Sequence, residues 1–218
     1  MSLKKTLEEY YSRRAEEYDD IYHRPDKTRL KEQKFLAEYI SQTFKGKFVL
    51  ELACGTGFWT KHLIKSAKKI LATDYSKNML EIASYRLAKN SNIILLQGDA
   101  YNPPISSPKF NGAMANFWFS HIPRGKIKKF LDTLHSKLAK NSVVVFIDGV
   151  YIEGLGGELI SKDKREDTFK MRTLSSGEKF DILKNYYNEK ELEKIFSKYS
   201  KRIEIEYLTN FWIVKYHI

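Results

Sequence analysis

The stretch 48–57, with the sequence Phe-Val-Leu-Glu-Leu-Ala-Cys-Gly-Thr-Gly, constrains the fold of this chain more than any other. An apolar run leads into small residues that include Gly55 and Gly57, and a segment compatible with a helix follows. This order predicts a buried strand, a tight turn and a helix N-terminus. Glycines permit positive φ and close approach of a ligand, while the first helical turn leaves N–H groups unpaired. Such a corner is typical of cofactor sites at the carboxyl end of a parallel strand, although similar turns occur without a ligand.

Strands and helices alternate along the following hundred residues. Apolar runs predict strands at 48–52, 69–73, 93–97, 110–116 and 142–148. Helical patterns separate these runs, and one of them begins after a capping Ser76. Two further strands are expected at 202–208 and 211–216, after a helix in which Asn188 and Glu191 have capping-box spacing. The alternation predicts a parallel sheet covered by helices on both faces.

The two ends of this core carry additional segments. Residues 3–22 show helical spacing of tyrosines, and a second helix is expected over 26–43 with Leu30, Phe35, Leu36, Tyr39 and Ile40 as its buried stripe. Alternation at 168–174 and 178–183 predicts an inserted β-hairpin, preceded by an exposed charged run at 162–167. We therefore expect one domain, divided into a helical cap (1–45), a core (46–150), an inserted loop and hairpin (151–187) and a closing helix and hairpin (188–218).

Composition narrows the class of protein. The apolar runs are too short to span a bilayer, no signal peptide is visible, and the single cysteine, Cys54, allows neither an internal disulfide nor a cysteine-based zinc cluster. We expect a cytoplasmic protein without a metal. The net charge of +11 raises nucleic acid as a partner, but the lysines are scattered along helix faces, so nucleic acid is the less favoured partner.

Taken together, these features resemble the class I S-adenosylmethionine (SAM) dependent methyltransferases. Glu51, Ala53, Gly55 and Gly57 fill the family's glycine motif, with Ala53 in place of the first glycine, a change that we expect to ask only for slightly more room at the turn. The resemblance implies a Rossmann-like sheet of seven strands in the order 3-2-1-4-5-7-6, with the last strand antiparallel. It also implies binding of SAM and release of S-adenosylhomocysteine (SAH).

The resemblance assigns cofactor contacts to the strand ends. Asp74, after strand two, would bind the ribose hydroxyls, and Asp99 with the N–H of Ala100 would bind the adenine amino group; carboxylates accept hydrogen bonds from both groups. Small-molecule members such as glycine N-methyltransferase carry a similar N-terminal cap. By that similarity Tyr10 and Tyr22 would close over SAM, and Arg29 would pair with its carboxylate through a planar fork. The remaining implied cofactor contacts are Thr56, Tyr75, Met79 and Asn116.

The acceptor is expected beyond strand four. Phe117, Trp118 and Phe119 could form the wall of a pocket for an apolar or aromatic substrate. Arg172 of the hairpin, with Lys184, could supply charge for an acidic substrate. His121 is the candidate general base because its unperturbed pKa lies near neutrality; a structural histidine is the equal alternative.

The sequence leaves other functions open. The position of Asp74 after the glycine turn also suits the ribose of NAD, the charge of +11 suits an RNA methyltransferase, and a SAM-binding protein without catalysis fits the same motifs. We favour the hypothesis of a methyltransferase that acts on a small molecule. The acceptor, the atom methylated and the oligomeric state are not encoded in these patterns.

Overall fold

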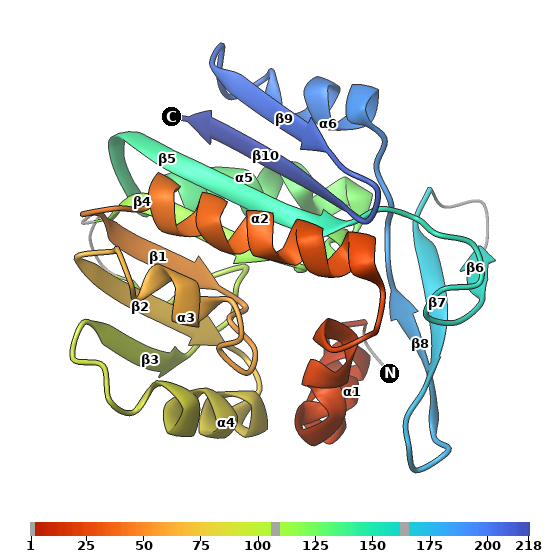
Figure 1. Ribbon diagram of the computed structural model, residues 1–218. Helices are drawn as coiled ribbons and strands as arrows, with labels where there is room; N and C mark the ends of the chain where they lie inside the picture. Colours follow the sequence, from red (N-terminus) through yellow and green to blue (C-terminus); the bar gives the residue numbers. More distant parts are fainter. Residues whose placement is uncertain (1–2, 106–109, 162–165) are drawn as a thin grey trace.

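Seven strands form one sheet in the order β3-β2-β1-β4-β5-β10-β9 (Figure 1). The computed structural model describes residues 3–105, 110–161 and 166–218. In this sheet β10 runs in the direction opposite to that of the other strands. Since β9 and β10 are the sixth and seventh strands of the sheet, the predicted order is confirmed. The strands are β1 (Phe48–Leu52), β2 (Lys69–Asp74), β3 (Ile93–Gln97), β4 (Phe110–Asn116), β5 (Leu138–Gly149), β9 (Ile203–Tyr207) and β10 (Phe211–His217).

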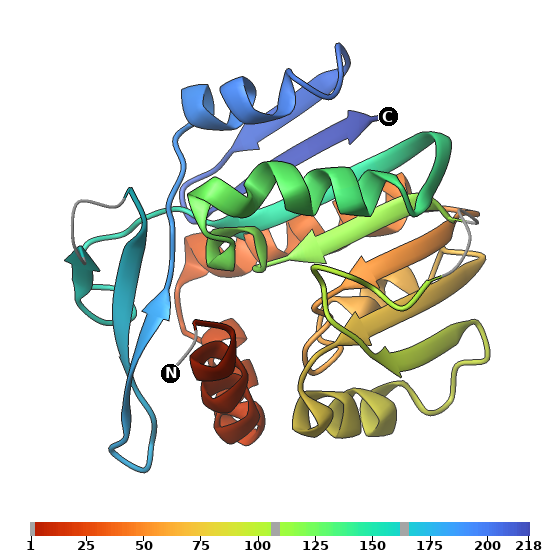
Figure 2. The ribbon, with the colours of Figure 1, turned by 180° about the vertical axis from the view of Figure 1, so that it is seen from behind.

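Helices cover both faces of the sheet, as the alternation of strands and helices predicts. Helices α2 (Lys27–Thr43) and α3 (Thr60–Leu63) lie on the face turned to the viewer in Figure 1, and α5 (Ile127–His135) lies on the face turned to the viewer in Figure 2. The buried strand β5 divides its side chains between the two layers. Val145 packs in the layer with α2, whereas Val144 and Phe146 pack in the layer with α5 and with α6 (Glu189–Phe196). Because both faces of β5 are buried, its sequence from residue 143 to 147 is a continuous apolar run.

The N-terminal cap differs from the expected pair of helices. Helix α1 (Leu3–Arg13) ends early, and a 3-10 helix, η1 (Ala15–Tyr22), follows it, so the prediction of one helix over 3–22 is wrong. This tighter path brings Asp19 to the hydroxyl of Thr56, at an oxygen–oxygen distance of 2.6 Å, and to Arg86.

The buried face of α2 was also predicted in part wrongly. Leu36 and Ile40 are buried, but Leu30 and Phe35 are 45% and 41% exposed. The N-cap of this helix is Asp26, whose side chain accepts a hydrogen bond from the N–H of Arg29.

The remaining elements follow the predicted order with shifted ends. Helix α4 (Lys77–Leu87) begins at the capping Ser76, and Asn188 and Glu191 form the predicted capping box of α6. Two short 3-10 helices, η2 (Phe119–His121) and η3 (Arg124–Lys126), precede α5. Helix α5 ends soon afterwards, because the chain enters β5 at Leu138 rather than at the predicted residue 142.

The insertion between β5 and α6 is a separate small sheet. Its strands are β6 (Leu159–Ser161), β7 (Thr168–Thr173) and β8 (Lys179–Leu183), in the order β6-β7-β8. The predicted hairpin is present, but the three-residue β6 was not predicted because its pattern is too short to recognise. Residues 162–165 of the expected charged run lie outside the described residues. In both views α1 lies between α4 and the hairpin β7–β8 (Figures 1 and 2).

The described ranges lack both a membrane-spanning helix and a metal-binding group. No helix within them is both long enough and apolar enough to cross a bilayer. They also contain no group of three or more histidine, cysteine or acidic side chains arranged to hold a metal ion.

Candidate active site

A cavity of about 600 Å³ opens at the carboxyl ends of β1 to β4, and α1 forms its opposite wall. The parallel order of these strands places four consecutive strand ends at one edge of the sheet. Most of the predicted site residues lie in this cavity. Those in its lining are Ala53, Gly55, Asp74, Tyr75, Met79, Asp99, Ala100, Asn116, Phe117, Trp118 and His121.

The turn after β1 has left-handed backbone at Ala53 (φ 51°), Gly55 (φ 56°) and Gly57 (φ 74°). The expectation that Ala53 asks only for slightly more room is therefore incomplete, because this residue takes a conformation that alanine disfavours by about 1–2 kcal/mol. Gly55 lies in the cavity wall, whereas Gly57 packs on α4, where an added Cβ would lie 2.9 Å from Leu87 Cδ1. The first glycine thus allows approach to the cavity, and the second allows close packing of the corner.

Asp74 ties the glycine turn to the start of α4. Its Oδ2 accepts a hydrogen bond from the N–H of Gly55 at 2.8 Å, and its Oδ1 accepts one from the N–H of Ser76 at 2.9 Å. Burial raises the pKa of this carboxyl group, while the two N–H groups oppose the rise. Each oxygen of a carboxylate keeps a further lone pair, so Asp74 can still accept hydrogen bonds from a ligand in the cavity.

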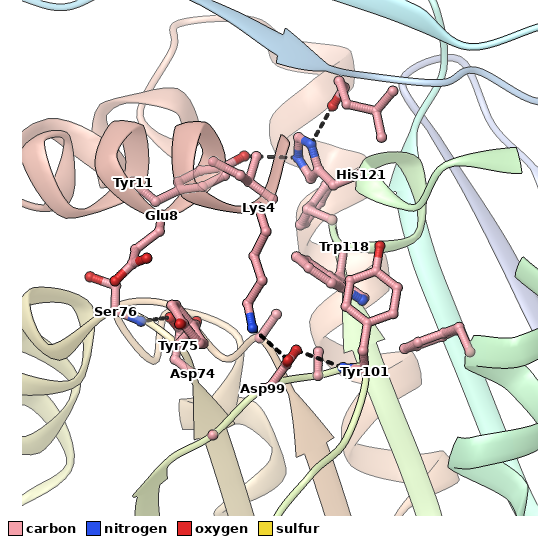
Figure 3. Close-up of a pocket in the computed structure, with 18 of the residues that line it drawn as sticks. Lys4, Glu8, Tyr11, Asp74, Tyr75, Ser76, Asp99, Tyr101, Trp118 and His121 are labelled. Carbon is pink, nitrogen blue, oxygen red and sulfur yellow. Dashed lines mark hydrogen bonds and ion pairs between the residues drawn. The ribbon is translucent and has the colours of Figure 1, made fainter. Parts of the chain in front are cut away.

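Asp99 lines the same cavity as Asp74 and is bonded to the cap. Its Oδ1 accepts a hydrogen bond from the N–H of Tyr101 at 3.0 Å, and its Oδ2 accepts one from Lys4 Nζ at 2.7 Å. Figure 3 shows the Lys4 side chain reaching from α1 down to Asp99. The ammonium group also lies 4.5 Å from the centre of the Tyr75 ring. Because both members of this ion pair are partly exposed, with 49% and 30% of their side-chain surface accessible, the pair adds no more than about 1 kcal/mol.

The end of β4 carries polar atoms without partners. Asn116 is 9% exposed and lines the cavity, yet neither atom of its side-chain amide makes a hydrogen bond to a described residue. Phe117, next along the chain, has left-handed backbone (φ 57°), an unfavourable state for a bulky residue. The indole N–H of Trp118 also lacks a partner among the described residues. Buried polar groups and strained backbone both cost free energy, and such features concentrate where a ligand binds.

His121 forms a dyad with a residue that the sequence analysis did not select. Its Nδ1 lies 2.6 Å from the carbonyl oxygen of Leu183, and its Nε2 lies 2.8 Å from the hydroxyl of Tyr11 (Figure 3). A carbonyl can only accept, so Nδ1 carries the proton and Nε2 accepts from Tyr11. Burial, with a contribution from the charge of Lys184, lowers the pKa of His121 to about 3. The unperturbed pKa near neutrality therefore does not describe His121 in the folded protein, because the ring is buried and beside a cation.

The other predicted site residues lie outside the cavity lining. Tyr22 stacks on Phe58 with ring centres 3.9 Å apart, and Arg29 lies over the ring of Phe211 at 4.7 Å. Glu51 is buried on β1, and burial raises its pKa to about 8. Three more, Tyr10, Thr56 and Gly57, pack against protein groups around the cavity, and the seventh is Arg172 on β7. Their roles toward SAM or the acceptor stay predictions.

The cap contributes lining residues that the sequence analysis did not assign to the site. They are Leu3, Lys4, Leu7, Glu8, Tyr11 and Tyr18. Leu7 and Tyr11 are four residues apart, which places them on one face of α1. This spacing could have indicated Tyr11 as a lining residue, but four tyrosines recur at similar intervals, and periodicity alone cannot decide which of them faces a ligand.

The sheet order, the glycine turn and the acids at successive strand ends define the fold of the class I methyltransferases. A protein-family model described as a methyltransferase domain matches residues 49–141. Two solved structures agree over nearly the whole chain. The DhpI–SAH complex has a TM-score of 0.76 at 25% identity and covers 98% of this chain and 95% of its own; the DhpI–SAM–HEP complex has 0.78 at 24%, with coverage of 98% and 96%.

Curated relatives match over a shorter span. The demethylmenaquinone methyltransferase of Staphylococcus carnosus (strain TM300) is 34% identical over 85 residues, which are 38% of this chain and 35% of the relative. The enzyme of the same description from Staphylococcus epidermidis (strain ATCC 12228 / FDA PCI 1200) is 31% identical over 107 residues, or 48% and 44%. The matched part is thus less than half the length of these relatives. Residues 49–141 therefore match a methyltransferase domain, and the chain as a whole has the fold of the class I methyltransferases.

Proposed function

We propose that this protein transfers a methyl group from SAM to a small-molecule acceptor. One observation carries the proposal: Gly55, Asp74 and Asp99 line the same cavity as Tyr11 and His121. The first three are the groups that the family's cofactor site requires, and the last two lie where an acceptor would meet it. A single cavity of about 600 Å³ falls in the size range of small-molecule sites.

The residues at the strand ends fit SAM. Asp74 would accept from the ribose hydroxyls and Asp99 from the adenine amino group, while the backbone at Gly55 permits close approach of the methionyl part. The unpartnered amide of Asn116 would offer a donor and an acceptor to the same ligand. For the adenine amino group to reach Asp99 Oδ2, Lys4 must share that oxygen or leave it.

Methyl transfer demands little beyond alignment and exclusion of water. SAM, when bound, supplies an activated methyl group on sulfur. The cap helix α1 closes the cavity from one side, and Phe117 and Trp118 form part of its apolar wall. Since Tyr11 occupies His121 Nε2, a proton from the acceptor would reach this nitrogen only through the Tyr11 hydroxyl. The low pKa makes His121 a weak base, so we assign it the role of holding Tyr11 toward the acceptor.

The identity of the acceptor does not follow from the relatives. The family match ends at residue 141, before the insertion that contributes Leu183 to the cavity. Quinones therefore remain one class to test rather than an assignment.

Calorimetry with SAM and SAH tests the cofactor. Asp99→Asn keeps an oxygen for the N–H of Tyr101 but loses the charge, so we expect its dissociation constant for SAM to rise about tenfold or more. Asp132→Asn is the matched control, since this aspartate pairs with Lys128 on the exposed face of α5. Absence of binding heat with both ligands in the unmodified protein would refute the proposal.

Labelled SAM then tests the reaction. The acceptor panel holds quinones, phenols, amines and carboxylic acids, with tRNA and rRNA included. We expect methylation of a small molecule and none of the RNAs; methylation of RNA alone would contradict the proposed acceptor class.

A further inference from the structure

Five cationic side chains of the cap and the insertion are close enough to interact electrostatically with one another. We call this group the cation cluster. Its members are Arg14, Arg24, Lys170, Arg172 and Lys184.

Strand register places part of the cation cluster on the hairpin face that meets α1. Lys170 pairs with Ile182 and Arg172 with Phe180, and directly paired residues of antiparallel strands share a face. Phe180 and Ile182 pack against Tyr10 of α1, with ring centres 5.6 Å apart for the aromatic pair. The two cations of β7 are therefore turned toward the cap.

The cap brings a cation to the same place. Arg14 donates to the hydroxyl of Tyr10 at 2.7 Å, and its guanidinium carbon lies 5.4 Å from the centre of the Tyr18 ring, a lining residue of the cavity. Arg24 follows at the end of η1, and its pKa is lowered by burial and by the charges of Arg172 and Arg14. Burial, with the charges of Arg172 and Lys184, likewise lowers the pKa of Lys170. These cations thus repel one another across a short distance.

Anionic groups near the cation cluster are already engaged. Asp148 accepts from Lys184 Nζ at 2.8 Å and from the N–H groups of Ser120 and Gly149. Glu17 accepts from the N–H of Ser175 at the hairpin turn.

Two of the guanidinium groups have neutral hydrogen-bond partners rather than carboxylates: Arg14 donates to the Tyr10 hydroxyl, and Arg172 donates to the carbonyl oxygen of Gly156. Among the described residues, neither Arg14, Arg24 nor Arg172 forms an ion pair with a carboxylate. Half-buried arginines of one sign are costly unless a counter-charge joins them, and their planar forks suit an oxyanion.

We propose that Arg14, Arg24 and Arg172 bind an oxyanion of the methyl acceptor, so that the acceptor is a small molecule with a carboxylate or phosphate group. This inference rests on the proposed methyltransferase function. The site adjoins the cavity wall made by Tyr11 and His121, so an acceptor held there by its anion presents its other end to the cofactor side. Lys170 and Lys184 are 1% and 9% exposed, so a nucleic acid cannot reach these two members of the cation cluster.

The test uses inorganic phosphate as the probe, with the full chain saturated with SAH. Calorimetry and thermal unfolding should detect phosphate binding to the unmodified protein, and Arg172→Gln should weaken it about tenfold or more. Arg172→Lys should restore part of the affinity because it keeps the charge without the fork. Lys179→Gln is the matched control: this lysine lies on the same hairpin, is exposed, and pairs with Thr173 on the opposite face.

Further measurements distinguish the possible outcomes of this phosphate-binding test. If Arg172→Gln does not fold, Arg24→Gln in the segment before α2 provides the same measurement. Equal phosphate binding by the variant and the unmodified protein overturns the inference, as does methylation of neutral amides in preference to the matching carboxylates. RNA binding lost in Arg172→Gln also overturns it, in favour of a nucleic-acid partner. Failure of the unmodified protein to bind SAH refutes the methyltransferase function itself and is measured separately.

Discussion

Replacement of Gly57 by alanine should destabilise the fold more than the same change at any glycine in open space. Gly57 has φ 74°, and an added Cβ would lie 2.9 Å from Leu87 Cδ1 and 3.4 Å from Ala83 Cβ. The left-handed backbone costs alanine about 1 kcal/mol after the gain from a less flexible unfolded chain is subtracted. Overpacking against α4 adds about 1–3 kcal/mol. We therefore expect a loss of about 2–4 kcal/mol in the free energy of unfolding.

Substitutions at two other glycines distinguish the backbone cost from the overpacking cost. Gly46 has φ 69° with no atom within 4 Å of an added Cβ, so Gly46→Ala should cost only the conformational part, about 1 kcal/mol. Gly125 also faces open space but does not have positive φ, so Gly125→Ala should change stability by less than about 0.5 kcal/mol.

Urea unfolding of the four proteins, followed by circular dichroism, gives the midpoints and slopes from which these free energies are calculated. If Gly57→Ala loses no more stability than Gly46→Ala, the close packing of the glycine turn on α4 is refuted.

Three further changes test the site and its supports. Gly55→Ala should cost about 1 kcal/mol of stability yet weaken SAM binding more than Gly46→Ala does, because its Cβ would enter the cavity 3.8 Å from Tyr18 Cε1; equal calorimetric affinities would contradict this. Glu51 keeps its proton up to about pH 8 when folded but loses it near 4.5 when unfolded, so stability should fall by about 1.4 kcal/mol per pH unit as the pH rises between these values; urea unfolding of Glu51→Gln should lack this component, and an unchanged slope would count against the raised pKa. Asp148→Asn should cost about 3–5 kcal/mol because it leaves Lys184 charged and buried, and the double variant Asp148→Asn/Lys184→Met should recover part of the loss in thermal unfolding; no recovery would show that the ion pair is not the cause.

The strands of the core could be predicted closely because each apolar run ends at turn residues. The ranges for β1, β3 and β4 agree with the structure to the residue, and the caps of α4 and α6 were also found. The strand ends also predicted one wall of the cavity, since Asp74 ends β2 and Asp99 follows β3 after Gly98. Local pattern was sufficient here because parallel sheets bring successive carboxyl ends together.

The wall of the cavity around Tyr11 and His121 could not be predicted in the same way. Tyr11 meets His121 across 110 positions of sequence, and the partner of the second ring nitrogen is a backbone carbonyl, which no residue type encodes. The pKa of His121 depends on burial and on Lys184, both products of tertiary packing. Amphipathic spacing also failed for α2, where Leu30 and Phe35 are apolar but exposed.

The position of α1 has a consequence for how the cavity of this protein could change in evolution. The sheet supplies one wall of the cavity through strand ends whose geometry the whole fold maintains, whereas the peripheral helix α1 supplies the opposite wall, with Leu183 of β8 and residues of η3 and α5 beside it. Substitutions in these peripheral segments can reshape the chamber without disturbing the buried layers. Under the proposed function, a new acceptor could be accommodated by altering this one short helix while the strand ends stay unchanged.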